Sequence, residues 1–258
     1  MDAIWKLVTG DGPLVATAIH DGYELRPDVG ANMALDKLGR LREEDPFTGS
    51  WTEVAPTNII GTHSRFQVDL NRPRETAIYI KPEDAWGLIV RREPPPEGTV
   101  AKSLAEYDAF YQASEALFRK MTAQHGRIVV YDLHTYNHRR NGPDGDVADP
   151  EANPEVNIGT ETMNRDLWAP VIDRFIGDLR AFDYMGRHLD VRENVKFKGG
   201  NFARHTHTSF PDSVCVLSIE FKKFFMDEWS GAPDTAQVAA IQAALASTTP
   251  GVLAALND

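Results

Sequence analysis

The sequence predicts an α/β layer fold with a mixed or mostly parallel sheet. Short apolar runs bounded by turn residues are typical of buried strands, and they alternate along the chain with segments of helical periodicity. The chain has 258 residues, 42% of them hydrophobic and 25% charged, which is enough for one sizeable core. We expect a single domain over residues 1–258, with a Pro-rich loop or insertion near residues 82–110.

The strands are predicted from runs of apolar and β-branched residues. In Ser64-Arg65-Phe66-Gln67-Val68-Asp69-Leu70 the apolar side chains alternate, which indicates a strand with one buried face. The other four runs are more uniformly apolar, as expected for strands inside a sheet. In chain order, we expect strands at residues 13–19, 64–70, 77–80, 127–133 and 214–221.

The helices are predicted from apolar residues that recur every three or four positions. One such series covers residues 104–121 and ends before Gly126, and another covers residues 163–179. A last helix contains Val238, Ile241 and Leu245 and should stop before Pro250. The three prolines at 94–96 predict a loop within the domain, because residues suited to catalysis lie on both sides of it.

Composition excludes several classes of function. The formal net charge of −11 disfavours a nucleic-acid partner, because an acidic surface repels phosphates. Cys215 is the single cysteine, so neither an intramolecular disulfide nor a thiolate zinc site can form. We recognise no signal peptide and no apolar run near the roughly 20 residues that span a bilayer, and we therefore expect a cytoplasmic protein with no membrane partner.

Polar clusters follow the predicted strands. His20 and Glu24 flank Gly22, so a loop that folds back could bring the imidazole and the carboxylate to one metal ion. Asp132 and His134 end the strand at 127–133, where the carboxylate could hold the imidazole of a metal ligand. The alternatives are a polar loop in the first case and a buried, hydrogen-bonded histidine in the second.

Two further groups of residues could supply a positive charge and a general base. Asp69, Asn71 and Arg72 follow the strand at 64–70; the guanidinium suits a carboxylate or an oxyanion, and Asp69 could orient the arginine or a histidine. Glu220 lies among apolar residues near a strand end, where a carboxylate is costly unless it is paired or acts as a general base. The alternatives are a solvated turn before Pro73 and an ion pair of Glu220 with a following lysine.

In this order and spacing, the clusters resemble the N-formylglutamate amidohydrolase family, which is related to the zinc carboxypeptidases and aspartoacylases. The resemblance runs from about residue 14 to about residue 229. The matching segments are A-I-H-D-G (18–22), S-R-F-Q-V-D-L-N-R (64–72), D-L-H-T (132–135), V-N-I-G-T (156–160), F-K-G-G (197–200) and L-S-I-E-F-K-K-F-F-M-D-E (217–228).

The resemblance implies a three-layer α/β/α sandwich of the phosphorylase/hydrolase type and one Zn²⁺ per chain. His20, Glu24 and His134 would be the metal ligands, with Asp21 in reserve because the related enzymes space their first ligands as His-x-x-Glu. Glu220 would be the catalytic base and Arg72 the oxyanion donor. Asn71, Arg72 and Arg204 would bind the substrate. Asp69 and Asp132 would be the carboxylates behind the metal ligands.

The implied activity is hydrolysis of N-formyl-L-glutamate, a small anionic substrate, to formate and L-glutamate. Two alternatives stay open at this point. One is a hydrolase for another N-acyl amino acid or a carboxypeptidase-like peptidase, and the other is a ligand-binding protein that has kept the fold without catalysis.

Overall fold

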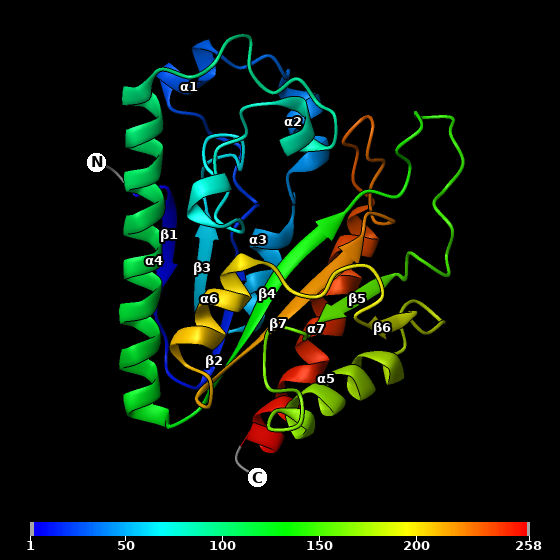
Figure 1. Cartoon of the computed structure of the whole chain (residues 1–258). Helices are drawn as coiled ribbons and strands as arrows, with labels where there is room; N and C mark the ends of the chain where they lie inside the picture. Colours follow the sequence, from blue (N-terminus) through cyan, green and yellow to red (C-terminus); the bar gives the residue numbers. More distant parts are fainter. Residues whose placement is uncertain (1–2, 257–258) are drawn as a thin grey trace.

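The computed structural model describes residues 3–256, which form a seven-stranded sheet with helices on both faces (Figure 1). The strand order is β1-β3-β2-β4-β7-β5-β6. The pairs β1–β3 and β5–β7 are antiparallel and the other four pairs are parallel, so the sheet is mixed and mostly parallel, as predicted. The strands are β1 (Trp5–Val8), β2 (Leu14–Ala18), β3 (Thr57–Gly61), β4 (Ile128–Tyr136), β5 (Val156–Gly159), β6 (Val191–Glu193) and β7 (Val214–Lys222).

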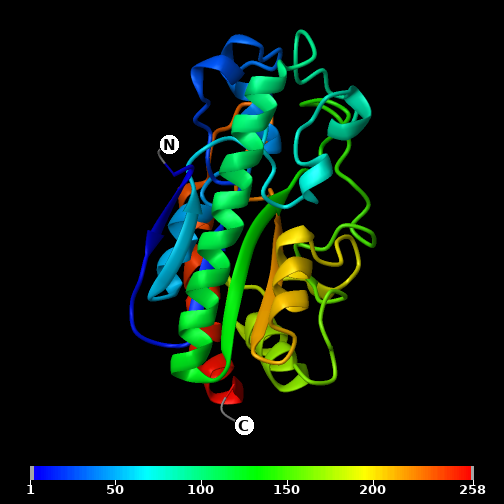
Figure 2. The same cartoon turned by 60° about the vertical axis from the view of Figure 1, so that its left-hand side comes forward.

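Two apolar layers cover the sheet. Alternate residues of β2 and β4 enter different core clusters, as Tyr131 and Val130 do, because successive side chains of a strand face opposite sides. One cluster contains α5 (Ala169–Ala181) and α7 (Thr235–Leu256) beside the short α3 (Thr48–Trp51), and the other contains α4 (Glu97–His125) and α6 (Asn201–Ser209). Figure 2 shows α4 lying along one face of the sheet while α7 lies behind it.

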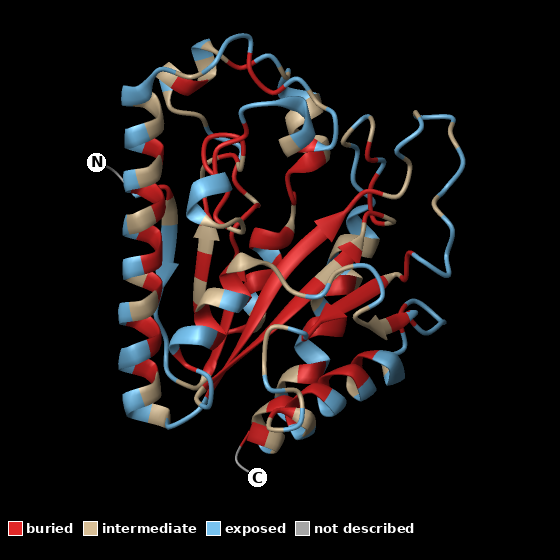
Figure 3. Cartoon of the chain, viewed as in Figure 1, coloured by how far each residue is buried: buried red, intermediate tan, exposed pale blue. Residues whose placement is uncertain are grey.

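Most of the short elements lie beyond the carboxyl ends of the central strands. They comprise α1 (Pro27–Ala31), α2 (Lys37–Glu43) and the 3₁₀ turns at Arg74–Thr76 and Pro82–Ala85, whereas the 3₁₀ turn at Thr52–Val54 contacts β2, β3 and α7. Figure 1 shows α1 and α2 at the end toward which the arrows of β4 and β7 point. Figure 3 shows β4 buried along its whole length. Polar residues that the sequence places at the carboxyl ends of these strands are therefore enclosed by α2 and the loops above them.

Two of the five predicted strands are wrong. Residues 64–70 form turns, in which the Gln67 amide donates to the Ser64 carbonyl and the Asp69 amide donates to the Ala77 carbonyl. Gln67 and Asp69 are as fully buried as the apolar residues between which they lie, so the alternation does not mark one exposed face. Residues 77–80 also form no strand: Ala77, Ile78 and Tyr79 are buried in two core clusters, and Ile80 is exposed.

Two helix boundaries also differ from the prediction. Helix α5 begins at Ala169, and Met163 and Leu167 pack against the core from turns before it. Helix α7 continues through Pro250 to Leu256. Proline leaves the carbonyl four residues earlier without an N–H partner, and the Thr249 hydroxyl donates to that carbonyl, Ala246, at 2.9 Å. Burial of Val252 and Leu256 then holds the last turns against the core.

Helix α7 is also long and apolar enough, by length and composition alone, to cross a membrane. No apolar run of that length was recognised in the sequence, where the last helix was expected to stop before Pro250. In this structure Ile241, Leu245 and Val252 are fully buried and α7 packs against α5.

Candidate active site

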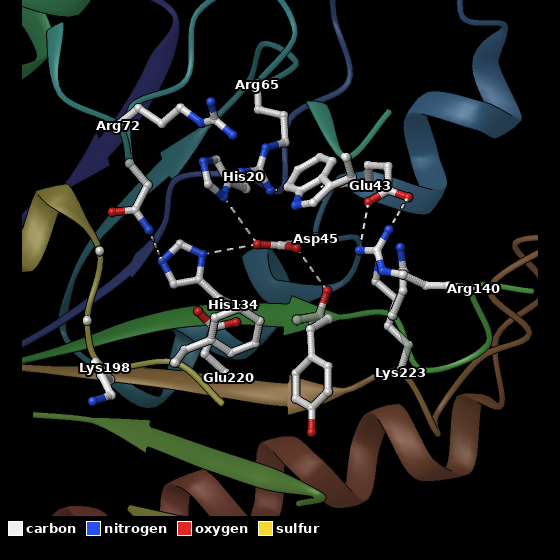
Figure 4. Close-up of a pocket in the computed structure, with 18 residues that line it drawn as sticks. His20, Glu43, Asp45, Arg65, Arg72, His134, Arg140, Lys198, Glu220 and Lys223 are labelled. Carbon is white, nitrogen blue, oxygen red and sulfur yellow. Dashed lines mark hydrogen bonds and ion pairs between the residues drawn. The ribbon is translucent and has the colours of Figure 1, made fainter. Parts of the chain in front are cut away.

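Two histidines and one aspartate converge beyond the ends of β2 and β4. Asp45 lies between α2 and α3, and its Oδ2 atom is 3.4 Å from Nδ1 of His20 and 3.0 Å from Nδ1 of His134. All three side chains are at most 3% exposed. Their donor atoms lie within 4.8 Å of one another, so the three residues form a group that could hold a metal ion (Figure 4).

A second carboxylate holds the far side of each imidazole. Nε2 of His20 is 2.8 Å from Oδ1 of Asp69, and Nε2 of His134 is 3.1 Å from Oδ2 of Asp132. A carboxylate at Nε2 favours the tautomer that leaves Nδ1 as an acceptor, which is the usual arrangement behind metal-binding histidines. The structure thus brings together His20, His134, Asp69 and Asp132, four of the residues singled out from the sequence.

The electrostatics of this group favour a bound cation. Burial alone would lower the pKa of His134, but the charges and hydrogen bonds of Asp132 and Asp45 outweigh it and raise that pKa well above its ordinary value. Burial would raise the pKa of Asp69, yet Arg65 and His20 hold it well below its usual range. The proton on the His134 imidazole compensates part of this buried negative charge, and a divalent ion would replace that proton.

Glu220 faces the same cavity from β7. It is the register partner of His134 on the neighbouring parallel strand. Burial raises its pKa to about 7, although the nearby His134 lowers it. Among the described residues no side chain hydrogen-bonds its carboxylate; Lys222 instead donates to the Asn153 carbonyl and Lys223 to the Arg42 and Glu44 carbonyls. The expected alternative, an ion pair with an adjacent lysine, is therefore not what the structure shows.

Asn71 and Arg72 line the same cavity as Glu220, and Asn71 lies beside His134. The Asn71 Nδ2 atom is 3.4 Å from Nε2 of His134, and its Oδ1 accepts the Phe202 amide at 3.0 Å. A Cβ atom on Gly200 would lie 2.2 Å from the Asn71 side-chain oxygen, so a larger residue there would displace the Asn71 amide. Arg72 stacks 4.3 Å from the Tyr79 ring centre and lies 3.6 Å from Asp69, and both it and Asn71 border the cavity.

Three residues considered from the sequence lie elsewhere. Glu24 is exposed and pairs in a β-bridge with His63, so the loop that was expected to fold back toward His20 runs along another segment instead. The Asp21 carboxylate accepts the Gly49 amide at 3.0 Å and lies outside the three-residue group. Arg204 is exposed on α6 and does not border this cavity.

The sequence analysis missed Asp45 and most of the cations around it. The cavity has a volume of about 240 Å³ and carries five cationic side chains: Arg65, Arg72, Arg140, Lys198 and Lys223. The available signal for Asp45 was the run Glu43-Glu44-Asp45 before Pro46, which resembles a solvated charge cluster although all three acids are at least 96% buried. Arg140, whose side chain is 45% exposed in a loop, pairs with Glu43 at the cavity wall.

Glu44 provides a stability prediction that does not depend on catalysis. Burial raises its pKa from 4.5 to about 7, against the smaller effects of Ser64, Arg40 and Lys223. The native state therefore favours the protonated form, and stability falls as pH rises from about 4.5 to about 7. We expect Glu44→Gln to remove this loss and to raise the free energy of unfolding at pH 8 by about 1–3 kcal/mol.

Denaturant unfolding of the native protein and Glu44→Gln at pH 5 and pH 8 would measure this effect. A larger gain at pH 8 than at pH 5 is the expected result. An equal change at both pH values would show that Glu44 does not titrate in the native state.

The fold and the site together define an α/β protein with a buried His-Asp-His group and a free glutamate at the carboxyl edge of its sheet. The family model for N-formylglutamate amidohydrolase matches residues 12–226, close to the span of the resemblance found in the sequence. The chain belongs to the N-formylglutamate amidohydrolase family, whose activity is that of a hydrolase.

Solved structures show the same fold. The crystal structure of N-formylglutamate amidohydrolase from Ralstonia eutropha JMP134 superposes with a TM-score of 0.76 at 18% identity, covering 99% of both chains. A gene product from Agrobacterium tumefaciens gives a TM-score of 0.72, also at 18% identity, over 100% of this chain and 97% of the other. No curated protein sequence matches the chain.

Proposed function

We propose that this protein is a zinc-dependent amidohydrolase that converts N-formyl-L-glutamate to formate and L-glutamate. Its family supports formylglutamate hydrolysis. The observation that carries the metal dependence is the buried group of His20, Asp45 and His134, with Glu220 unpaired beside it. One zinc ion per chain would be held by Nδ1 of each histidine and by the Asp45 carboxylate.

The residues fit this ion by their chemistry. Two neutral imidazoles and one carboxylate are common zinc ligands in catalytic sites, where a further position stays open to water or substrate. Asp69 completes the arrangement by hydrogen-bonding Nε2 of His20, and Asp132 lies at ion-pair distance from Nε2 of His134. When bound, the ion would lower the pKa of water toward about 7 and polarise the formyl carbonyl.

Glu220 is the general base in this proposal. Its carboxylate accepts a proton from the attacking water as the water oxygen bonds to the formyl carbon. It then returns a proton to the amine as the C–N bond breaks, so that formate and the free amino acid leave. A pKa near 7 suits both transfers at neutral pH, because the group can be ionised before the first and protonated before the second.

Asn71 and Arg72 are placed to bind the α-carboxylate and to stabilise the developing oxyanion. Arg72 is braced by the Tyr79 ring and keeps donors available toward the cavity, while Asn71 sits next to His134. The cavity of about 240 Å³ is smaller than the roughly 300–1,000 Å³ typical of drug-sized ligands, which favours a single N-acyl amino acid over a peptide.

Release of L-glutamate from a panel of substrates tests the proposal. The zinc-loaded protein should hydrolyse N-formyl-L-glutamate in preference to N-acetyl-L-glutamate and to a dipeptide with C-terminal glutamate. Faster hydrolysis of the acetyl compound or the dipeptide would identify a different acyl-amino-acid hydrolase or a peptidase. A protein that binds zinc and hydrolyses none of them would contradict the enzymatic function.

The carboxylate behind His134 provides a prediction about metal affinity. We expect Asp132→Asn to weaken zinc binding by about 10- to 100-fold, because the asparagine no longer holds the imidazole as a charged acceptor. Competition with a chromophoric chelator would measure the affinity. Thr17→Val is the matched control, because Thr17 donates to the other Asp132 oxygen at 2.7 Å. This substitution removes a hydrogen bond to Asp132 but no charge. Equal affinities in the native protein and Asp132→Asn would contradict this role.

A further inference from the structure

Asn137 is a buried amide that the protein itself leaves without a partner. It directly follows β4, three residues after His134, and is 4% exposed. Its Oδ1 atom is buried without a hydrogen bond, and no hydrogen bond joins its side chain to any other described residue. The side chain borders the active-site cavity. A buried amide is costly unless it is paired, and its Nδ2 group, from which no described residue accepts, can donate to a partner that arrives with the substrate.

Arg140 follows in the same loop and borders the same cavity. Its Nη1 and Nη2 atoms lie 3.3 and 3.2 Å from the two oxygens of Glu43. Arg42 contacts Glu43 as well, at 3.2 Å, so two guanidinium groups share one buried carboxylate. This part of the cavity wall therefore has positive charge that its own carboxylate does not neutralise. Trp86, 5.5 Å from the Arg140 guanidinium, braces it from the loop above.

Two of the three arginines that border the cavity, Arg72 and Arg140, lie on opposite sides of the metal-binding group. Figure 4 shows Arg72 on one side of Asp45 and Arg140 on the other, with Glu220 near the middle. Asn137 and Arg140 also border a neighbouring cavity of about 240 Å³, so there is room beyond them. A substrate with a carboxylate at each end could place its amide at Asp45 and reach both arginines.

We propose that Asn137 and Arg140 form the subsite that binds the side-chain carboxylate of the substrate and thereby select acidic N-acyl amino acids. The inference rests on the proposed function and adds to it the residues that determine specificity. The Asn137 Nδ2 group and the outer N–H groups of Arg140 would donate to the carboxylate, while Asn71 and Arg72 hold the α-carboxylate. Neutral side chains of the same size would lose the ionic part of this interaction.

Steady-state kinetics with N-formyl-L-glutamate and its neutral isostere N-formyl-L-glutamine test the subsite. Arg140→Met should raise KM for formylglutamate by about 10- to 100-fold, with a much smaller change for formylglutamine. Asn137→Leu should raise KM for both substrates, because the amide can donate to either side chain. For both variants kcat should change less than KM, since neither residue contacts the reacting atoms.

Arg139→Met is the matched control for charge and position. Arg139 precedes Arg140, contacts the Pro143 carbonyl and does not border the active-site cavity. It should leave both KM values unchanged. The proposal is overturned if Arg140→Met affects the two substrates equally, if it has no effect, or if Arg139→Met has the same effect.

Thermal unfolding separates a structural role from a binding role. Since Asn137 has no internal hydrogen bond to lose, Asn137→Leu should leave Tm unchanged or higher; a marked fall in Tm would instead assign the residue to folding and overturn its place in the subsite. If the native protein hydrolyses neither formyl compound, calorimetric titration with glutarate still tests the subsite. Weaker glutarate binding in Arg140→Met than in Arg139→Met supports it, and equal binding overturns it.

Discussion

Asp45→Asn is expected to abolish stoichiometric zinc binding and to lower kcat/KM by roughly 1,000-fold or more. Asp45 Oδ2 lies between the two Nδ1 atoms, so the substitution removes the anionic ligand while keeping the shape of the side chain. The amide oxygen of asparagine can still accept from the Thr135 hydroxyl, which lies 3.0 Å from Oδ1, so the loop should stay folded.

Metal content by mass spectrometry and formate release would be measured on the same preparations. Glu24→Gln is the matched control, because Glu24 was the carboxylate expected from the sequence and it lies exposed in another loop. It should leave both quantities unchanged. Zinc retained in Asp45→Asn, or lost in Glu24→Gln, would contradict the assignment of Asp45 as the ligand.

Glu220→Gln is expected to keep zinc bound and to lower kcat by about 10²- to 10⁴-fold. Glutamine preserves the size of the side chain but cannot accept a proton from water. Glu220 pairs with no lysine, and its burial already opposes the charged form, so the substitution should not destabilise the fold.

The pH dependence of kcat/KM is a second test of Glu220 as the general base. Because burial raises the pKa of Glu220 to about 7, its basic form is lost as pH falls through that range, and a bound cation would move this loss to lower pH. The acidic limb of kcat/KM should therefore lie at or below about pH 7 in the native protein and be absent from the residual activity of Glu220→Gln. A variant with full kcat, or with an unchanged acidic limb, would show that another group is the base.

The sequence predicted the strands and helices whose buried residues form a local hydrophobic pattern. The central strands β2, β4 and β7 are continuous apolar runs, and α4 has a clear helical period that ends at Gly126 with φ of 75°. The outer strands β1, β5 and β6 have three or four residues each, too few for a period to show. Residues 64–70 alternate like a strand because polar side chains between the apolar ones are buried and paired, as Gln67 is with Glu106 and Asp69 with His20.

The candidate site was predictable where a chemical residue type follows a recognisable strand. His20, His134 and Glu220 are of this kind, and their strands bring them together at one edge of the sheet. Asp45 lies in a loop 25 residues after His20, and its position depends on backbone contacts such as its amide donating to the His20 carbonyl at 2.9 Å. Such a contact leaves no periodic signal in the sequence. Glu24, which is closer to His20 along the chain, was therefore chosen as the carboxylate ligand.

Anomalous diffraction from crystals of the zinc-loaded protein, measured on both sides of the zinc absorption edge, tests the central claim most directly. The account predicts one strong peak per chain between Nδ1 of His20, Nδ1 of His134 and the Asp45 carboxylate, with Glu220 near its open side. A peak bound by Glu24 or Asp21, or no peak at this group when zinc is supplied in excess, would contradict it.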